Sequence, residues 1–140
     1  MKSARRYSRE FALRALYQWQ LSGATASEIE QQLAEDERFP RADKALYAQI
    51  VKGVIEHADE LKSVIAPALD RRVEELAPIE RAILLIGVYE LVHCPETPYK
   101  VIVNEAIELA KVYGGTDGHK YVNAVLDKLA RGLRSAEKRG

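Results

Sequence analysis

The chain has 140 residues and no net charge, because its 21 basic residues balance its 21 acidic ones. A chain of this length buries about two-thirds of its unfolded surface, so it can fold without a disulfide or a structural metal. Its single cysteine excludes an internal disulfide and suits a reducing compartment. The sequence has neither a signal-peptide pattern nor the roughly 20 apolar residues that a membrane span needs. We therefore expect one soluble, cytoplasmic domain over residues 1–140.

The charges are unevenly distributed along the chain. Residues 1–14 carry five basic side chains and one acidic side chain, a net charge of +4, and residues 128–140 carry the same balance. Residues 15–127 therefore carry a net charge of −8. Two basic ends on an acidic body indicate a surface for a polyanion and a separate acidic face. Basic termini also simply keep proteins soluble, and composition alone slightly favours that explanation.

The N-terminal half has the apolar periodicity of amphipathic helices divided by turns. Ser3 is a suitable N-cap for the first helix, because its hydroxyl can accept a hydrogen bond from a free backbone amide. Thr25 and Glu28 form a capping box at the start of the second. The expected helices cover about residues 4–21, 26–35 and 41–66, the last divided by a bend after Gly53.

The most apolar segment, residues 79–91, is expected to be a central buried helix. It carries no charge from Ala82 to Tyr89, and a helix that is apolar on nearly all sides belongs in the middle of a bundle. Two more helices are expected over residues 98–113, capped by Thr97, and from about residue 117 to 134. No segment alternates as a strand does, so the sequence predicts an all-α fold of about seven helices, followed by a disordered basic tail.

The sequence offers no convergent set of catalytic or metal-binding residues. His93 and Cys94 are adjacent and so project in different directions, and His57 and His119 have no ligand at a usable spacing. The glycine-rich loop 114–118 precedes a helix N-terminus that could hold a phosphate, but it lacks the lysine and the strand of a P-loop. We expect no catalytic residue, no metal ion and no cofactor.

Basic side chains lie beside aromatic ones at two places. Arg5, Arg6 and Arg9 lie within about one helical turn, with Tyr7 between them, and Lys120 precedes Tyr121 in the first turn of the last long helix. Proteins bind single-stranded RNA through aromatic stacking beside positive charge. The spacing does not decide whether Tyr121 stacks on a base or packs in the core.

Two segments, PYKVIVNEAIELAK at residues 98–111 and DGHKYVNAVLDK at residues 117–128, resemble the NusB family of transcription antitermination factors. The arginine-rich start and residues 79–81 and 89–91 agree in order, so the resemblance covers nearly the whole chain. It implies an all-α, non-catalytic protein built as two small packed helical bundles around the central helix. The bundles would cover about residues 1–70 and 71–134, with a basic tail at 135–140.

The resemblance also implies partners. NusB-like proteins pair with the ribosomal protein NusE, and the pair binds boxA RNA. With other Nus factors it helps RNA polymerase read through terminators, notably in ribosomal RNA operons. The alternative is an RNA-binding accessory module, related to the one fused to ribosomal RNA cytosine methyltransferases but lacking a cofactor-binding domain here. A homodimer is a third possibility, and no membrane partner is expected.

The resemblance assigns individual residues to two surfaces. The arginine-rich start is expected to contact phosphates, Tyr121 to stack on a base, and Asp117 to moderate the affinity by repelling phosphate. Glu80 is expected to contact NusE, and Glu74 and Glu75 are weaker candidates for the same face. Gly118 departs from the family pattern, which commonly has serine there. The expected RNA-binding residues are Lys2, Arg5, Arg6, Arg9, Asp117, Lys120 and Tyr121.

Overall fold

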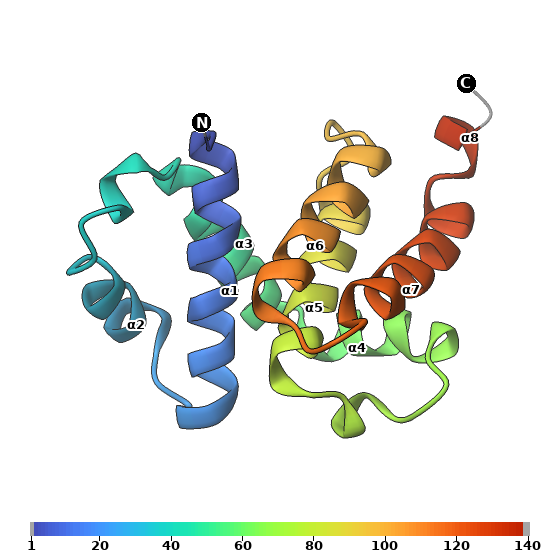
Figure 1. Ribbon diagram of the computed structural model, residues 1–140, viewed down its shortest axis with the longest axis horizontal. Coiled ribbons are helices and arrows are strands. Elements are labelled where there is room, and N and C mark those ends of the chain that lie inside the picture. The colour runs from blue at the N-terminus through green and yellow to red at the C-terminus, as the bar shows by residue number, and fades with distance from the viewer. Residues whose placement is uncertain (1, 139–140) are drawn as a thin grey trace. The chain divides into compact units, whose positions relative to one another are not determined.

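The computed structural model describes residues 2–138, and all regular structure in that range is helical, which confirms the predicted all-α fold (Figure 1). The chain divides into two compact units, Met1–Glu56 and His57–Gly140. This boundary lies earlier than the division near residue 70 that the sequence suggests. The physical reason is that α4 (Ala58–Ile65) packs against α5 (Pro78–His93) within the second unit.

The first unit is built around α1, which packs against the two other helices of this unit. Its helices are α1 (Ala4–Ser22), α2 (Ala26–Leu33) and α3 (Lys44–Glu56). Ser3 Oγ accepts a hydrogen bond from the Arg6 amide, and Gly23 ends α1 with a φ of +68°. Thr25 and Glu28 form the reciprocal hydrogen bonds of a capping box at the start of α2. These local signals therefore set the helix ends that the sequence predicts.

An aromatic cluster and a serine hydroxyl fix the start of α1 against the segment before α3. Phe39, in the short 3₁₀ helix η1 (Phe39–Arg41), meets Phe11 and Tyr47 edge to face, with ring centroids 5.1 and 5.4 Å away. Ser8 Oγ lies 3.0 Å from the Ala4 carbonyl oxygen and 2.6 Å from that of Asp43. The N-terminal turn of α1 is thereby held beside η1.

The second unit surrounds α5, and ten consecutive residues of that helix, Ala82–Leu91, are buried. It packs against α4, α6 (Tyr99–Tyr113) and α7 (Gly118–Leu133), which confirms the predicted central helix. The 3₁₀ turns η2 (Ala66–Ala68) and η3 (Val73–Glu75) lie between α4 and α5. Across residues 2–138, no helix combines the length and the apolar character that a membrane crossing requires.

Gly87 allows α7 to approach α5 closely. A Cβ atom at this position would lie 2.8 Å from Leu126 Cδ1 and 3.0 Å from Leu126 Cδ2. We expect Gly87→Ala to displace Leu126 and to lower the free energy of unfolding by about 1–3 kcal/mol, in spite of alanine's better helix propensity. Urea denaturation measures the change. Gly132→Ala in α7, where a Cβ would meet nothing within 4 Å, is the matched control and should be neutral or slightly stabilising.

Arg134 closes the C-terminal end of α5. Its side chain is buried, with 8% exposure, yet each of the five N–H groups of a guanidinium has an acceptor. Nε donates to Leu91 O, Nη1 to Thr97 O and Glu137 Oε2, and Nη2 to Glu90 O and Cys94 O, at 2.6–3.2 Å. The carbonyls at a helix C-terminus lack intrahelical partners. Here Arg134, about 40 residues further along the chain, donates hydrogen bonds to several of these carbonyls.

Two expectations for the C-terminal region are wrong. Residues expected to form a disordered tail instead form α8 (Ser135–Lys138), and residues 139–140 lie outside the described residues. Thr97 is buried and does not cap α6; instead the Tyr99 amide donates to Glu137 Oε1 at 2.7 Å. Glu137 also accepts a bond from Arg134, and these two contacts hold the start of α8 against the turn before α6.

Candidate nucleic-acid interface

The first unit carries a basic cluster, defined as Lys2, Arg5, Arg6 and Arg41, around the N-terminal turn of α1. Arg5, Arg6 and Arg41 are exposed. The Lys2 ammonium lies 4.9 Å from the centroid of the Tyr7 ring, and Arg41 Nη1 donates to the Tyr7 hydroxyl at 3.4 Å. Arg41 was not predicted, because only the packing of η1 beside α1 brings it to this end of the helix.

The basic cluster is not uniformly available to a phosphate. Lys2 Nζ forms an ion pair with Glu10 Oε1 at 2.6 Å, so part of its charge is already balanced. Arg9 is only 2% exposed, in contrast to the expected phosphate contact. Arg5 and Arg9 do share a helix face, as their spacing requires. One turn further along α1, however, that face is covered, so the exposed guanidinium groups at this end of the helix are those of Arg5, Arg6 and Arg41.

In the second unit, two residues from the segment between α4 and α5 hold Tyr121 in place. We call Asp70, Arg71 and Tyr121 the tyrosine clamp. The Tyr121 hydroxyl donates to Asp70 Oδ1 at 3.0 Å, and the Arg71 guanidinium lies 4.9 Å from the centroid of the ring. Arg71 also donates to both carboxylate oxygens of Asp70, at 2.8 and 3.2 Å. The ring is half-buried, so Tyr121 is neither a core residue nor a free side chain.

The hydrogen bonds of the tyrosine clamp set the protonation of its members. The bond from Arg71, followed by the bond from Tyr121, lowers the pKa of Asp70 to about 2. Burial, followed by the bond to Asp70, raises the pKa of Tyr121. Near neutral pH the carboxylate is therefore ionised and the phenol is neutral. The hydroxyl stays a donor to Asp70, and this bond and the Arg71 contact fix the orientation of the ring.

Asp117 and Lys120 lie at the start of α7, on the same helical turn as Tyr121. Asp117 has a φ of +62° and its side chain makes no capping hydrogen bond. Its carboxylate is instead 3.3 Å from Lys120 Nζ, and both side chains are more than 60% exposed. A surface ion pair of this kind contributes little to stability, so Lys120 can exchange its carboxylate partner for a phosphate at small cost.

The acidic residues that the sequence assigns to a protein partner fall in two places. The Glu80 carboxylate lies against the first residue of α7: a Cβ atom at Gly118 would be 3.1 Å from Glu80 Oε1. Glycine at position 118 therefore fits the close approach of Glu80. Glu74 and Glu75 are exposed in η3, and Glu75 Oε1 accepts bonds from the Arg72 amide and Nε at 3.1 and 3.2 Å.

Comparison with known proteins identifies the family. The model of the NusB family matches residues 6–131 of the chain. The chain belongs to the NusB family. A relative named transcription antitermination protein NusB, from Thiobacillus denitrificans, is 54% identical over 137 residues, which cover 98% of this chain and 94% of the relative.

Solved structures of NusB proteins have the same fold. The structure of T. maritima NusB has a TM-score of 0.82 and 29% identity, with full coverage of both chains. A crystal structure of the antitermination factors NusB and NusE in complex with double-stranded RNA has a TM-score of 0.81 and 26% identity, and covers 94% of this chain and 99% of that one. The resemblance of the 98–111 and 117–128 segments to the NusB family is thus confirmed.

Three charged residues of the two candidate surfaces were missed by sequence reasoning. Arg41 joins the NusB-like arginine-rich start, while Asp70 and Arg71 hold the aromatic ring of the NusB-like segment 117–128. The adjacent opposite charges of Asp70 and Arg71 were visible in the sequence, but they are typical of any solvated connector. Their role follows only from the contact with Tyr121, 51 residues further along.

Proposed function

We propose that this chain is a non-catalytic RNA-binding adaptor in transcription antitermination. It pairs with a NusE-type ribosomal protein and binds boxA RNA. With other Nus factors, the pair lets RNA polymerase read through terminators, notably in ribosomal RNA operons. The observation that carries the proposal is the 54% identity to a transcription antitermination protein NusB across nearly the whole of both chains.

The chemistry of the candidate surfaces supports RNA as the ligand. Arg5, Arg6 and Arg41 can bind phosphates in any sequence, because guanidinium groups pair with phosphate oxygens through two parallel hydrogen bonds. Tyr121 offers a half-exposed aromatic ring for stacking, with Lys120 on the adjacent position for a phosphate. Asp117 would repel a phosphate at the same loop and so moderate the affinity.

The acidic residues support a basic protein as the second partner. Residues 15–127 carry a net charge of −8, and Glu74 and Glu75 are exposed. Complementary charge speeds association and selects the partner. The solved NusB neighbour was crystallised with NusE and RNA, and we carry this pair of partners over to the present chain as part of the proposal.

The proposal predicts that Arg5→Ala combined with Arg6→Ala weakens RNA binding and its salt dependence together. Each phosphate contact with a single strand contributes about 0.7 to the slope of log K against log salt, so losing two should make the slope shallower by about 1.4. Fluorescence anisotropy of a labelled boxA RNA between about 50 and 200 mM salt, with and without NusE, measures both quantities.

Two controls make this experiment decisive. Lys52→Ala removes an exposed cation of the same unit, from α3, and should leave affinity and slope unchanged. A scrambled RNA should bind more weakly than boxA RNA once NusE is present. Unchanged binding in the double variant at low salt would refute the basic cluster as the phosphate-binding surface. Equal binding of both RNAs, unaffected by NusE, would refute the adaptor function.

A further inference from the structure

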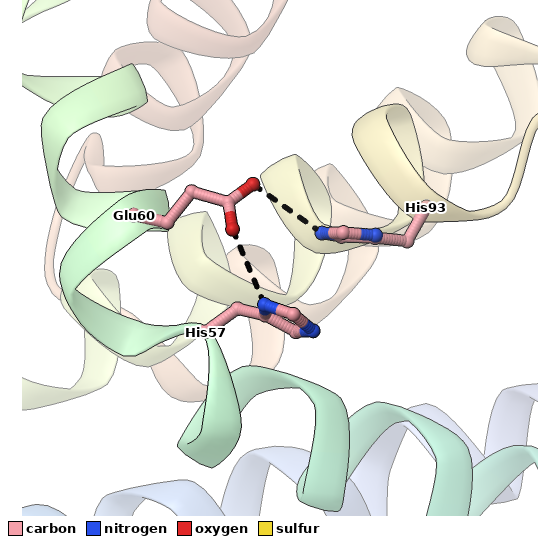
Figure 2. Close-up of side chains that lie close together, drawn as sticks. All are labelled: His57, Glu60 and His93. Atoms are coloured by element: carbon pink, nitrogen blue, oxygen red, sulfur yellow. Dashed lines mark hydrogen bonds and ion pairs between the residues drawn. The ribbon is translucent and has the colours of Figure 1, made fainter.

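Three side chains with metal-binding groups converge where the start of α4 lies beside the end of α5, outside the basic cluster and the tyrosine clamp (Figure 2). His57 is the N-cap residue of α4, Glu60 lies in its first turn, and His93 is the last residue of α5. His57 Nδ1 is 3.2 Å from Glu60 Oε2, and His93 Nε2 is 3.7 Å from Glu60 Oε1. Figure 2 shows both rings directing a nitrogen toward the same carboxylate.

The donor set and its spacing suit a transition-metal ion. Two imidazole nitrogens and one carboxylate oxygen form a known zinc-binding combination that leaves one position open. Metal–ligand bonds of about 2.1 Å in a tetrahedral site separate the ligand atoms by roughly 3.4 Å. The two imidazole nitrogens lie 3.2 and 3.7 Å from different oxygens of the Glu60 carboxylate. When each residue contributes one ligand atom, the three atoms lie within 4.8 Å of one another. Small side-chain rotations are enough to close the site.

His93 provides a second, independent observation. Its Nε2 atom is screened from solvent and makes no hydrogen bond to any described residue, because the Glu60 oxygen 3.7 Å away is beyond hydrogen-bonding distance. A buried imidazole nitrogen without a partner is costly. The ring itself is held between two others, with the His57 centroid at 4.6 Å and the Tyr89 centroid at 5.0 Å, both nearly parallel to it.

The site is also accessible. Although His93 Nε2 itself is screened from solvent, the side chains of His57, Glu60 and His93 are 36%, 52% and 28% exposed, so an ion can reach the cluster once a side chain rotates. We propose that His57, Glu60 and His93 form a binding site for a divalent transition-metal ion of the zinc class, with water in the open position. The bound ion links the start of α4 to the end of α5. It replaces the contact of both rings with Glu60 by three metal–ligand bonds.

Metal titration of the full chain, prepared without a histidine tag, tests this site. Isothermal titration calorimetry with ZnCl₂ should give saturable binding of one ion per chain, and thermal melting should shift upward as Zn²⁺ is added. Co²⁺ should produce the visible absorption bands of a low-coordinate site containing imidazole. His57→Gln and His93→Gln should each weaken Zn²⁺ binding more than about tenfold, because loss of a second-shell partner alone costs that much.

The matched control is His119→Gln, which removes the remaining histidine, outside the cluster. It should bind Zn²⁺ as the unaltered chain does. Glutamine at position 57 or 93 keeps a polar amide for Glu60, and circular dichroism verifies that these variants fold. The absence of saturable binding, binding that survives His57→Gln and His93→Gln, or equal losses in His119→Gln would each overturn the proposal. Zn²⁺ binding with unchanged RNA affinity would leave the adaptor function intact.

Discussion

Replacing Arg134 with methionine should lower the free energy of unfolding by about 3–5 kcal/mol, the cost typical of removing one partner from a buried charged network. Methionine replaces the apolar stem of the arginine side chain but donates no hydrogen bond. The variant therefore leaves the Glu90, Leu91, Cys94 and Thr97 carbonyls without the guanidinium, and leaves Glu137 without its cation. Urea denaturation followed by circular dichroism measures the loss.

Two further variants separate the hydrogen bonds of Arg134 from its charge. Arg134→Lys keeps the charge but has three donors in place of five, so we expect an intermediate loss. Arg131→Met removes an exposed arginine of α7 that pairs with Asp127 at 2.9 Å, and it should change the stability by less than about 0.5 kcal/mol. A loss below about 1 kcal/mol in Arg134→Met would contradict the role given to its hydrogen bonds.

The same residue shows where sequence reasoning stops. Helix starts were predicted well when their signal lies within a few residues, as with Ser3 before α1 and the Thr25–Glu28 capping box of α2. Arg134 was predicted only as the end of the last long helix and as one of the basic C-terminal charges. Its hydrogen bonds were not foreseen, because the carbonyls that accept them lie about 40 residues earlier in the chain. Thr97 was predicted to cap α6 from local pattern alone, and a carboxylate from α8 does so instead.

The candidate functional residues show the same contrast between signals that are local in the sequence and contacts between distant segments. Lys120 and Tyr121 were singled out as a basic residue beside an aromatic one, and the family resemblance then assigned them to RNA binding. Asp70, in a connector, became relevant only through its contact with the Tyr121 hydroxyl. Helical spacing placed Arg9 within about one turn of Arg5 and Arg6, but it could not show that Arg9 is buried. The convergence of His57 and His93 was missed for the same reason, since their spacing in sequence matches no metal motif.

Replacing Tyr121 with alanine should weaken binding of boxA RNA by about 1–3 kcal/mol, the usual cost of losing an aromatic stacking residue, which corresponds to roughly 5- to 150-fold in affinity. Tyr121→Phe keeps the ring and its contact with the Arg71 guanidinium, and loses only the hydroxyl bond to Asp70. We therefore expect Tyr121→Phe to retain most of the affinity. Fluorescence anisotropy with a labelled RNA compares the two variants under the conditions used for Arg5 and Arg6.

The two variants distinguish stacking from the other ways in which Tyr121 could act. A stacked ring neutralises no phosphate, so Tyr121→Ala should lower affinity without changing the salt slope, unlike the Arg5 and Arg6 variant. If Tyr121→Phe lost as much RNA affinity as Tyr121→Ala, the contribution to binding would come from the hydroxyl and its bond to Asp70, not from stacking of the ring. The pKa of Asp70 should rise from about 2 in Tyr121→Phe but stay below its usual range, because the Arg71 bond is the larger cause of its depression. Loss of the helical circular dichroism signal in Tyr121→Ala would instead show that the side chain is required for folding.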